Sequence, residues 1–230
     1  HSLDRRQRQM CIRDSADPLD QWFYISTPIN GDVSFKISPV GFPDQELSYI
    51  VNNTNPKKIQ IASAGYSQLF QDPATTSSVT SDKGYIIEAS DVIYVSIRMN
   101  AGGGAQAGAL VSKGDNGLGT TFRIGTYDNQ GNPGDNYMNF FSVMATQDNT
   151  TVNLSSNNIS GLVIQNYGGQ FPVENIILNR GESYTVALKV TDSNGNRDGL
   201  IGTLVSADKN VVVNSGSANG SFGNGGARDY

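Results

Sequence analysis

The chain has 230 residues and a formal net charge of −5, with 37% hydrophobic and 16% charged residues. This length accommodates one large β domain or two modules of about 100 residues each, and the hydrophobic fraction suffices for a buried core. Basic side chains gather only in the first fifteen residues, so nucleic-acid binding is not expected, and no apolar run approaches the roughly 20 residues of a membrane-spanning helix.

The first segment along the chain, residues 1–15 (HSLDRRQRQMCIRDS), differs in composition from the rest. It contains four arginines and the single histidine (His1) and cysteine (Cys11). It is similar to the translated sequencing-adapter scar that often opens reading frames assembled from environmental DNA, so we expect it to be disordered. A genuine basic arm is the alternative. The remaining chain lacks the side chains of Ser-His-Asp and Cys-His catalysis and of common zinc and haem sites, and we expect no enzyme.

Beyond Asp20, short apolar runs alternate with turn signals of Asn, Gly and Asp about every 8 to 12 residues, a spacing typical of all-β sandwiches and barrels. The strands expected first are 21–28, 32–38, 47–52, 58–62, 85–88 and 92–99, the last two as a hairpin. Residues 101–109 (AGGGAQAGA) indicate a flexible link or a close-approach loop. The strands expected after it are 120–127, 139–145, 151–154, 161–165, 175–178, 183–190, 200–205 and 210–214.

Two segments of the chain have similar sequences, residues 84–95 (GYIIEASDVIYV) and 202–213 (GTLVSADKNVVV). Shorter similarities precede both in the same order, which favours a duplicated module that ends each time in the same hairpin. Chance similarity between turn-rich hairpins is the competing interpretation. We therefore predict an all-β fold of two tandem antiparallel β-sandwich modules, residues 16–105 and 106–230. One larger barrel or propeller-like arrangement is the alternative.

Five segments together resemble a known family. They are 20–28 (DQWFYISTP), 142–152 (SVMATQDNTTV), 178–184 (LNRGESY), 202–209 (GTLVSADK) and 213–226 (VNSGSANGSFGNGG). They resemble the N-terminal region of IgG-Fc-binding-protein-like domains, in the version found in very large secreted proteins of gliding bacteria. The resemblance implies a β-rich module of a longer chain, secreted or at the cell surface, with neighbouring domains and no established catalytic activity. We accordingly expect the second module to be truncated at its C-terminus.

One loop has the donor pattern of a cation site. Asp192, Asn194, Asn196 and Asp198 place oxygen ligands at alternate positions, as loops that wrap Ca²⁺ do. Arg197 stands where an EF-hand loop has Gly, and the closing Glu is missing. A metal-free Asn-Gly hairpin turn is the favoured interpretation. We expect no cofactor, with calcium at these four residues as the exception to test.

Three adjacent aromatic residues, Trp22, Phe23 and Tyr24, are candidates for ligand binding. In a strand, Trp22 and Tyr24 share one face and Phe23 points to the other. A core strand of a sandwich accounts for all three, and exposed aromatics that stack on sugar are the alternative.

The expected function is therefore a non-catalytic extracellular module for adhesion, surface recognition or spacing, whose partner is an unidentified extracellular protein or glycan. A glycan-binding module of a polysaccharide-utilising system is the second hypothesis. A carboxylate-dependent hydrolase is the third, and it requires two neighbouring buried carboxylates in a cleft.

Overall fold

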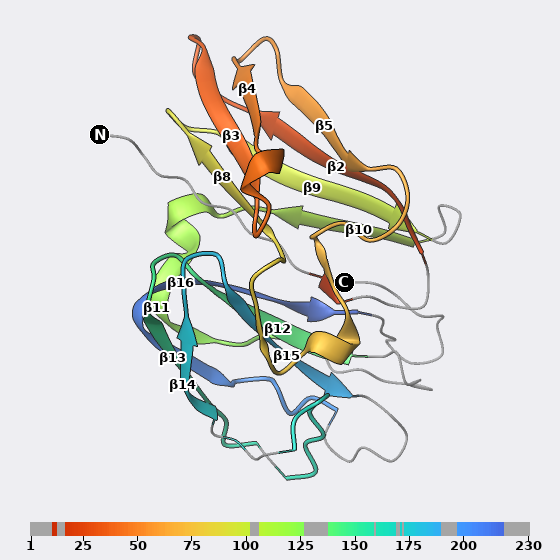
Figure 1. The fold of residues 1–230 in the computed structure, drawn as a ribbon, viewed down its shortest axis with the longest axis vertical. Helices are drawn as coiled ribbons and strands as arrows, with labels where there is room; N and C mark the ends of the chain where they lie inside the picture. The colour runs from red at the N-terminus through yellow and green to blue at the C-terminus, as the bar shows by residue number, and fades with distance from the viewer. Residues whose placement is uncertain are drawn as a thin grey trace. The chain divides into compact units, whose positions relative to one another are not determined.

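The computed structural model describes residues 11–12, 17–101, 106–126, 138–158, 160–168, 171, 173–189 and 197–218. The elements in these ranges are β-strands and short 3-10 helices, so the expected all-β class is confirmed (Figure 1). The described residues form two compact units. Unit 1 comprises the described residues within Ala16–Leu69 and Asp82–Gly117. Unit 2 comprises the described residues within Met10–Ser15, Phe70–Ser81 and Leu118–Tyr230.

Unit 1 contains two antiparallel sheets. The strands of the four-stranded sheet, in the order β10-β9-β2-β5, are β10 (Gln106–Val111), β9 (Tyr94–Ala101), β2 (Pro18–Ser26) and β5 (Lys57–Ala62). The strands of the three-stranded sheet, in the order β4-β3-β8, are β4 (Leu47–Val51), β3 (Val33–Pro39) and β8 (Tyr85–Ala89). The 3-10 helix η1 (Pro43–Gln45) lies between β3 and β4 in the chain.

The sequence alternation of these strands produces the core of unit 1. In β2, Phe23 and Ile25 are buried, and in β3 every second residue from Val33 is buried. Successive side chains of a strand point to opposite faces, so one face of each sheet is apolar. The two faces meet where the rings of Phe23 and Tyr85 form a T-shaped pair, with centroids 5.3 Å apart and planes at 87°. Unit 1 is therefore a two-sheet sandwich.

Unit 2 contains one large antiparallel sheet and a small parallel pair. The large sheet has the order β14-β13-β16-β12-β15-β7, with β11 also paired to β16. Its strands are β7 (Val79–Thr80), β11 (Leu118–Arg123), β12 (Met138–Ala145), β13 (Thr150–Ser155), β14 (Val173–Leu178), β15 (Ser183–Lys189) and β16 (Leu204–Ser217). The parallel pair joins β1 (Cys11–Ile12) to β6 (Phe70–Gln71). The 3-10 helix η2 (Pro73–Thr75) belongs to unit 2. The 3-10 helix η4 (Gly114–Gly117) belongs to unit 1.

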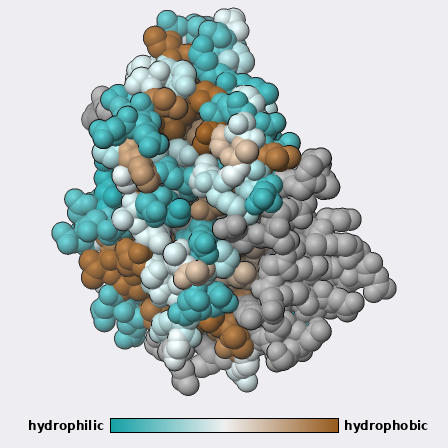
Figure 2. All heavy atoms as spheres, turned by 45° about the vertical axis from the view of Figure 1, so that its right-hand side comes forward, coloured by the Kyte–Doolittle hydropathy of each residue, from teal (hydrophilic) through white to brown (hydrophobic). Residues whose placement is uncertain are grey.

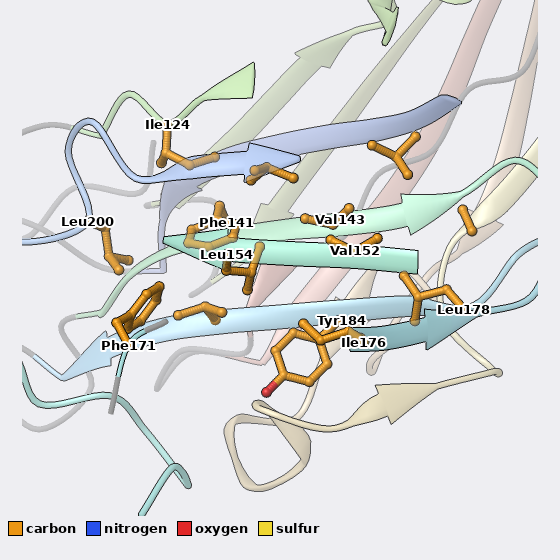
Figure 3. Packing of buried hydrophobic residues seen from close by; sticks show 14 of the residues in the cluster. Ile124, Phe141, Val143, Val152, Leu154, Phe171, Ile176, Leu178, Tyr184 and Leu200 are labelled. Carbon is orange, nitrogen blue, oxygen red and sulfur yellow. The ribbon is translucent and has the colours of Figure 1, made fainter. Parts of the chain in front are cut away.

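The long strand β16 curves the large sheet around its own core. Residues 204–207 pair with β13, whereas 211–217 pair with β12, so one strand forms ladders with two successive strands. Phe141 and Val143 of β12 and Val152 and Leu154 of β13 point into the resulting cluster (Figure 3). Burial of each such side chain contributes about 1.5–3 kcal/mol, and this cluster is the main source of stability in unit 2.

Two expectations about chain organisation are corrected. The predicted hairpin at 85–99 is wrong, because β8 and β9 lie in different sheets. In the matching segment, residues 204–213 belong to the single strand β16. The predicted boundary after residue 105 falls inside an antiparallel ladder, since Gln106 of β10 pairs with Ala101 of β9. The two units instead separate after Gly117, and Phe70–Ser81 belongs to unit 2.

Within residues 1–15, only Cys11–Ile12 are described, as strand β1, and the remainder lies outside the described residues. The interpretation of this segment as a scar stays a prediction. Within the described ranges, none of the helices has the length and apolar character needed to cross a membrane.

Candidate ligand-binding face

The outer face of the four-stranded sheet in unit 1 carries exposed aromatic and cationic side chains. The burial of Phe23 and Ile25 fixes which way β2 faces, so Trp22 and Tyr24 point away from the core. We call this surface the aromatic face. Its residues are Trp22 and Tyr24 of β2, Lys58 and Gln60 of β5, Tyr94, Ser96 and Arg98 of β9, and Val111 of β10.

Strand register places the aromatic and cationic side chains next to one another. Tyr24 pairs with Lys58 on one side, and Trp22 pairs with Arg98 on the other. Tyr24 is 38% exposed and Tyr94 is 60% exposed. Directly opposed residues have Cβ atoms about 4.5–5.5 Å apart, so the rings and the charges form one continuous surface.

The Lys58 ammonium lies over the aromatic rings of β2. Its Nζ is 4.0 Å from the centroid of the Trp22 ring and 5.7 Å from that of the Tyr24 ring. Attraction between a cation and the ring quadrupole contributes about 0.5–1 kcal/mol at an exposed site. This contact orders a long side chain that would otherwise sample many rotamers in solvent.

A shallow groove of about 240 Å³ crosses this face. It extends over all four strands of the sheet, because its lining includes Lys58 of β5, Tyr24 of β2, Tyr94 of β9 and Val111 of β10. Val111 is itself exposed. Hydrophobic residues reach the protein surface in separate patches surrounded by hydrophilic ones (Figure 2). The groove has the dimensions of a subsite for part of an extended ligand rather than of a closed pocket.

A larger hollow of about 1030 Å³ lies over the three-stranded sheet of unit 1. Tyr49 and Ile50 line it, together with side chains of both charge signs, Lys36 and Glu88. Lys36 already has a partner, since its Nζ is 2.7 Å from Glu46 Oε1. The aromatic face is the better candidate, because the described part of the chain supplies no ion pair to its two cations, Lys58 and Arg98.

Three of the segments that carry the family resemblance meet in unit 2 at one polar corner, which we define as residues 146–149, 179–182 and 208–210. Lys209 Nζ donates to the carbonyl oxygens of Asp148 (2.6 Å) and Asn149 (2.8 Å). The Asp148 carboxylate accepts from the Arg180 amide at 2.9 Å, and the Asp208 carboxylate accepts from the Thr151 amide at 2.8 Å. These charged side chains satisfy backbone groups where β12, β15 and β16 change direction, so the corner has a structural role.

The predicted cation loop is described only at its end. Asp192, Asn194 and Asn196 lie outside the described residues, and Asp198 is exposed in a turn where its carbonyl accepts from the Ile201 amide at 2.8 Å. Groups of three or more His, Cys, Asp or Glu side chains suited to a metal are absent from the ranges that the structure describes. Calcium binding at this loop stays a prediction.

The structure also bears on the other candidate residues. The interpretation that a core strand accounts for all three aromatics of β2 is wrong for Trp22 and Tyr24, which lie outside the core. Sequence reasoning missed Lys58, Tyr94 and Arg98, although each alternates with a buried residue in its strand.

None of the buried polar side chains in the described part of the chain is Asp or Glu, so the cleft carboxylates that a hydrolase requires do not appear there.

Comparison with known proteins identifies the family. The family model described as IgGFc binding protein matches residues 107–230, which is more than half of the chain. The match includes most of β10 and, of unit 2, the part from Leu118 onward. No curated protein and no solved structure matches the chain. The matched range contains all three segments of the polar corner. The chain belongs to the IgGFc-binding protein family.

Proposed function

We propose that this chain is a non-catalytic extracellular binding module that contributes to adhesion, surface recognition or spacing within a large secreted protein. Membership of a family described by binding supports this proposal, as does the all-β architecture. The single observation that carries it is the aromatic face of unit 1. Immunoglobulin is not proposed as the partner, because none of the observations on this chain points to it.

The aromatic face has the physical properties of a recognition surface. Tyr24 and Tyr94 expose large rings whose two side-chain torsions lose little conformational entropy on binding. The ladder of four strands holds the backbone beneath them, so the rings are preorganised. Exposed aromatic rings beside a groove bind partners more effectively than isolated apolar side chains.

A glycan-binding module of a polysaccharide-utilising system is the second candidate. Trp22 and Tyr24 share the outer face of one strand, and Tyr94 lies diagonally across the next. The C–H groups of a pyranose ring form an apolar surface that packs against such flat rings. A groove that crosses four strands fits an extended chain of sugars better than a compact small molecule.

Binding of the whole 230-residue chain to immobilised glycans and extracellular matrix proteins tests the proposal. The diagnostic variant is Tyr24→Ala with Tyr94→Ala, and the matched control is Phe42→Ala, since Phe42 is 40% exposed and lies outside the aromatic face. We expect at least one ligand to bind and the double variant to bind it about tenfold more weakly, with the control unchanged. Absence of any ligand, or an equal loss in the control, would contradict the proposal.

A further inference from the structure

Lys58 and Arg98 are the two cations of the aromatic face. Lys58 and Arg98 are exposed, and the described residues contain no ion pair to either of them. Elsewhere in unit 1, Lys36 and Lys83 each lie within 4.0 Å of a carboxylate oxygen. The chain has a net charge of −5, so two cations without an ion pair form a locally positive patch on an acidic protein.

Asp20 of β2 places one carboxylate at the rim of this face, beside Gln60. Asp20 Oδ1 accepts a 2.9 Å hydrogen bond from Gln60 Nε2. Arg98 uses one of its five N–H donors on the carbonyl oxygen of Ile97 at 3.0 Å, which leaves the others available for a ligand. The face therefore presents donors and positive charge around its aromatic rings.

The cations lie on opposite sides of the aromatic pair. Lys58 is across the ladder from Tyr24 on β5, and Arg98 is across from Trp22 on β9. With strands about 4.8 Å apart and a rise of about 3.4 Å per residue, their Cα atoms are separated by about 12 Å along the diagonal. A linear ligand on that diagonal passes over both rings and reaches both charges.

We propose that the ligand of the aromatic face is an acidic polysaccharide that carries carboxylates on its sugar residues. This inference rests on the proposed binding function and specifies its ligand. The sugar rings pack on Trp22 and Tyr24, while carboxylates pair with Lys58 and Arg98. The Arg98 guanidinium suits a planar carboxylate, and the Lys58 ammonium is already ordered above the rings.

Charge distinguishes this ligand from a neutral glycan and from a nucleic acid. The Lys58 ammonium lies over the Trp22 ring, and a neutral sugar that stacks there must displace it without providing a compensating charge. A carboxylate provides that charge. Two cations on an acidic chain are too few for the phosphate neutralisation on which nucleic-acid affinity depends.

Calorimetric titration of the whole chain with three acidic polysaccharides tests this inference: polygalacturonate, alginate and hyaluronan. The matched neutral probe for each is its carboxyl-reduced form, which keeps the rings and removes the charge. We expect at least one acidic polymer to bind about tenfold more tightly than its reduced form, and its affinity to fall with rising salt. Lys58→Met and Arg98→Met should each abolish most of this preference.

The control is Lys113→Met, since Lys113 is an exposed lysine of unit 1 outside the aromatic face. It should bind like the unsubstituted chain. Equal binding of acidic and reduced polymers, with no effect of Lys58→Met, would overturn the acidic-ligand inference and leave the binding function intact. Binding to none of the three acidic polymers would also overturn it. The binding function itself would be contradicted only if the chain bound none of the immobilised glycans and extracellular matrix proteins.

Discussion

Thr185 Oγ1 donates a 2.8 Å hydrogen bond to Gln71 Oε1, although 114 residues separate the two in sequence. Both side chains are fully buried, and Gln71 Nε2 donates in turn to the Thr75 carbonyl at 2.8 Å. The Ser77 amide donates to the Thr185 carbonyl at 2.8 Å. These hydrogen bonds hold the segment Phe70–Ser81 against β15. For this reason Phe70–Ser81 belongs to unit 2, although it lies between two segments of unit 1 in the sequence.

Replacement of Gln71 by Leu should destabilise the protein by about 1–3 kcal/mol, because it removes the side-chain hydrogen bonds to Thr75 and Thr185 and leaves the Thr75 carbonyl without that donor. Urea unfolding, followed by tyrosine and tryptophan fluorescence, measures the change. Gln45→Leu is the control, since Gln45 is exposed, and its effect should stay within about 0.5 kcal/mol. Equal effects of the two substitutions would show that Gln71 does not fasten this segment.

The polar corner predicts a second stability effect. Lys209→Met keeps the aliphatic stem but removes the donor to the Asp148 and Asn149 carbonyls, so we expect a loss of about 1–2 kcal/mol. The same unfolding assay measures it, with Lys113→Met as the control that should be neutral. If Lys209→Met unfolds at the same urea concentration as the unsubstituted chain, the hydrogen bonds of Lys209 contribute nothing measurable to the free energy of unfolding.

The chain's strands were largely predictable, whereas their connections were not. A short turn between two apolar runs looks the same in sequence whether the second run pairs with the first or continues into the facing sheet. Residues 90–93 connect β8 to a strand of the other sheet, β9. Residues 101–109 suggested a link because most of them are small, but residues 106–109 form backbone hydrogen bonds with β9, and such bonds require no side chains. A Cβ on Gly108 would lie 3.0 Å from Met99 Cγ, so the absence of a side chain permits close packing there.

The aromatic face was predictable in part. The alternation in β2 correctly separated Phe23 from its neighbours, but which side faces the core depends on Tyr85, a residue of the other sheet. Lys58 and Arg98 belong to different strands from Trp22, and only the register of the ladders brings them together. Register depends on long-range pairing that a local sequence pattern does not specify.

Glu46 provides a prediction about proton binding. Its carboxylate accepts hydrogen bonds from Lys36 and Ser38, and the bond from Lys36, followed by that from Ser38, lowers the pKa of Glu46. A folded-state pKa below the unfolded value means that Glu46 stabilises the fold above its unfolded pKa. This contribution is lost as the pH falls through the folded pKa.

Lys36→Met should raise the pKa of Glu46 toward its ordinary value, as measured by carboxyl-carbon NMR titration. Lys83→Met is the control, because Lys83 lies beside Asp82 and should leave the titration of Glu46 unchanged. An unaltered pKa of Glu46 in Lys36→Met would mean that Ser38 alone holds the carboxylate in its charged form.

Gly202 and Gly31 form a matched pair that separates backbone strain from packing. A Cβ at either position meets nothing within 4 Å, but Gly202 has φ of +80° in the turn before β16, and Gly31 has no positive φ. Gly202→Ala should therefore destabilise the protein by about 1–2 kcal/mol through strain alone. Gly31→Ala should be neutral or stabilise it by up to about 1 kcal/mol, because it restricts the unfolded chain. Urea midpoints at an unchanged slope measure both effects. The Gly202 amide donates a 2.8 Å hydrogen bond to the Ile124 carbonyl, which helps to hold the backbone of this turn. An unchanged midpoint for Gly202→Ala would contradict the prediction, because it would mean that the turn accepts a side chain without strain.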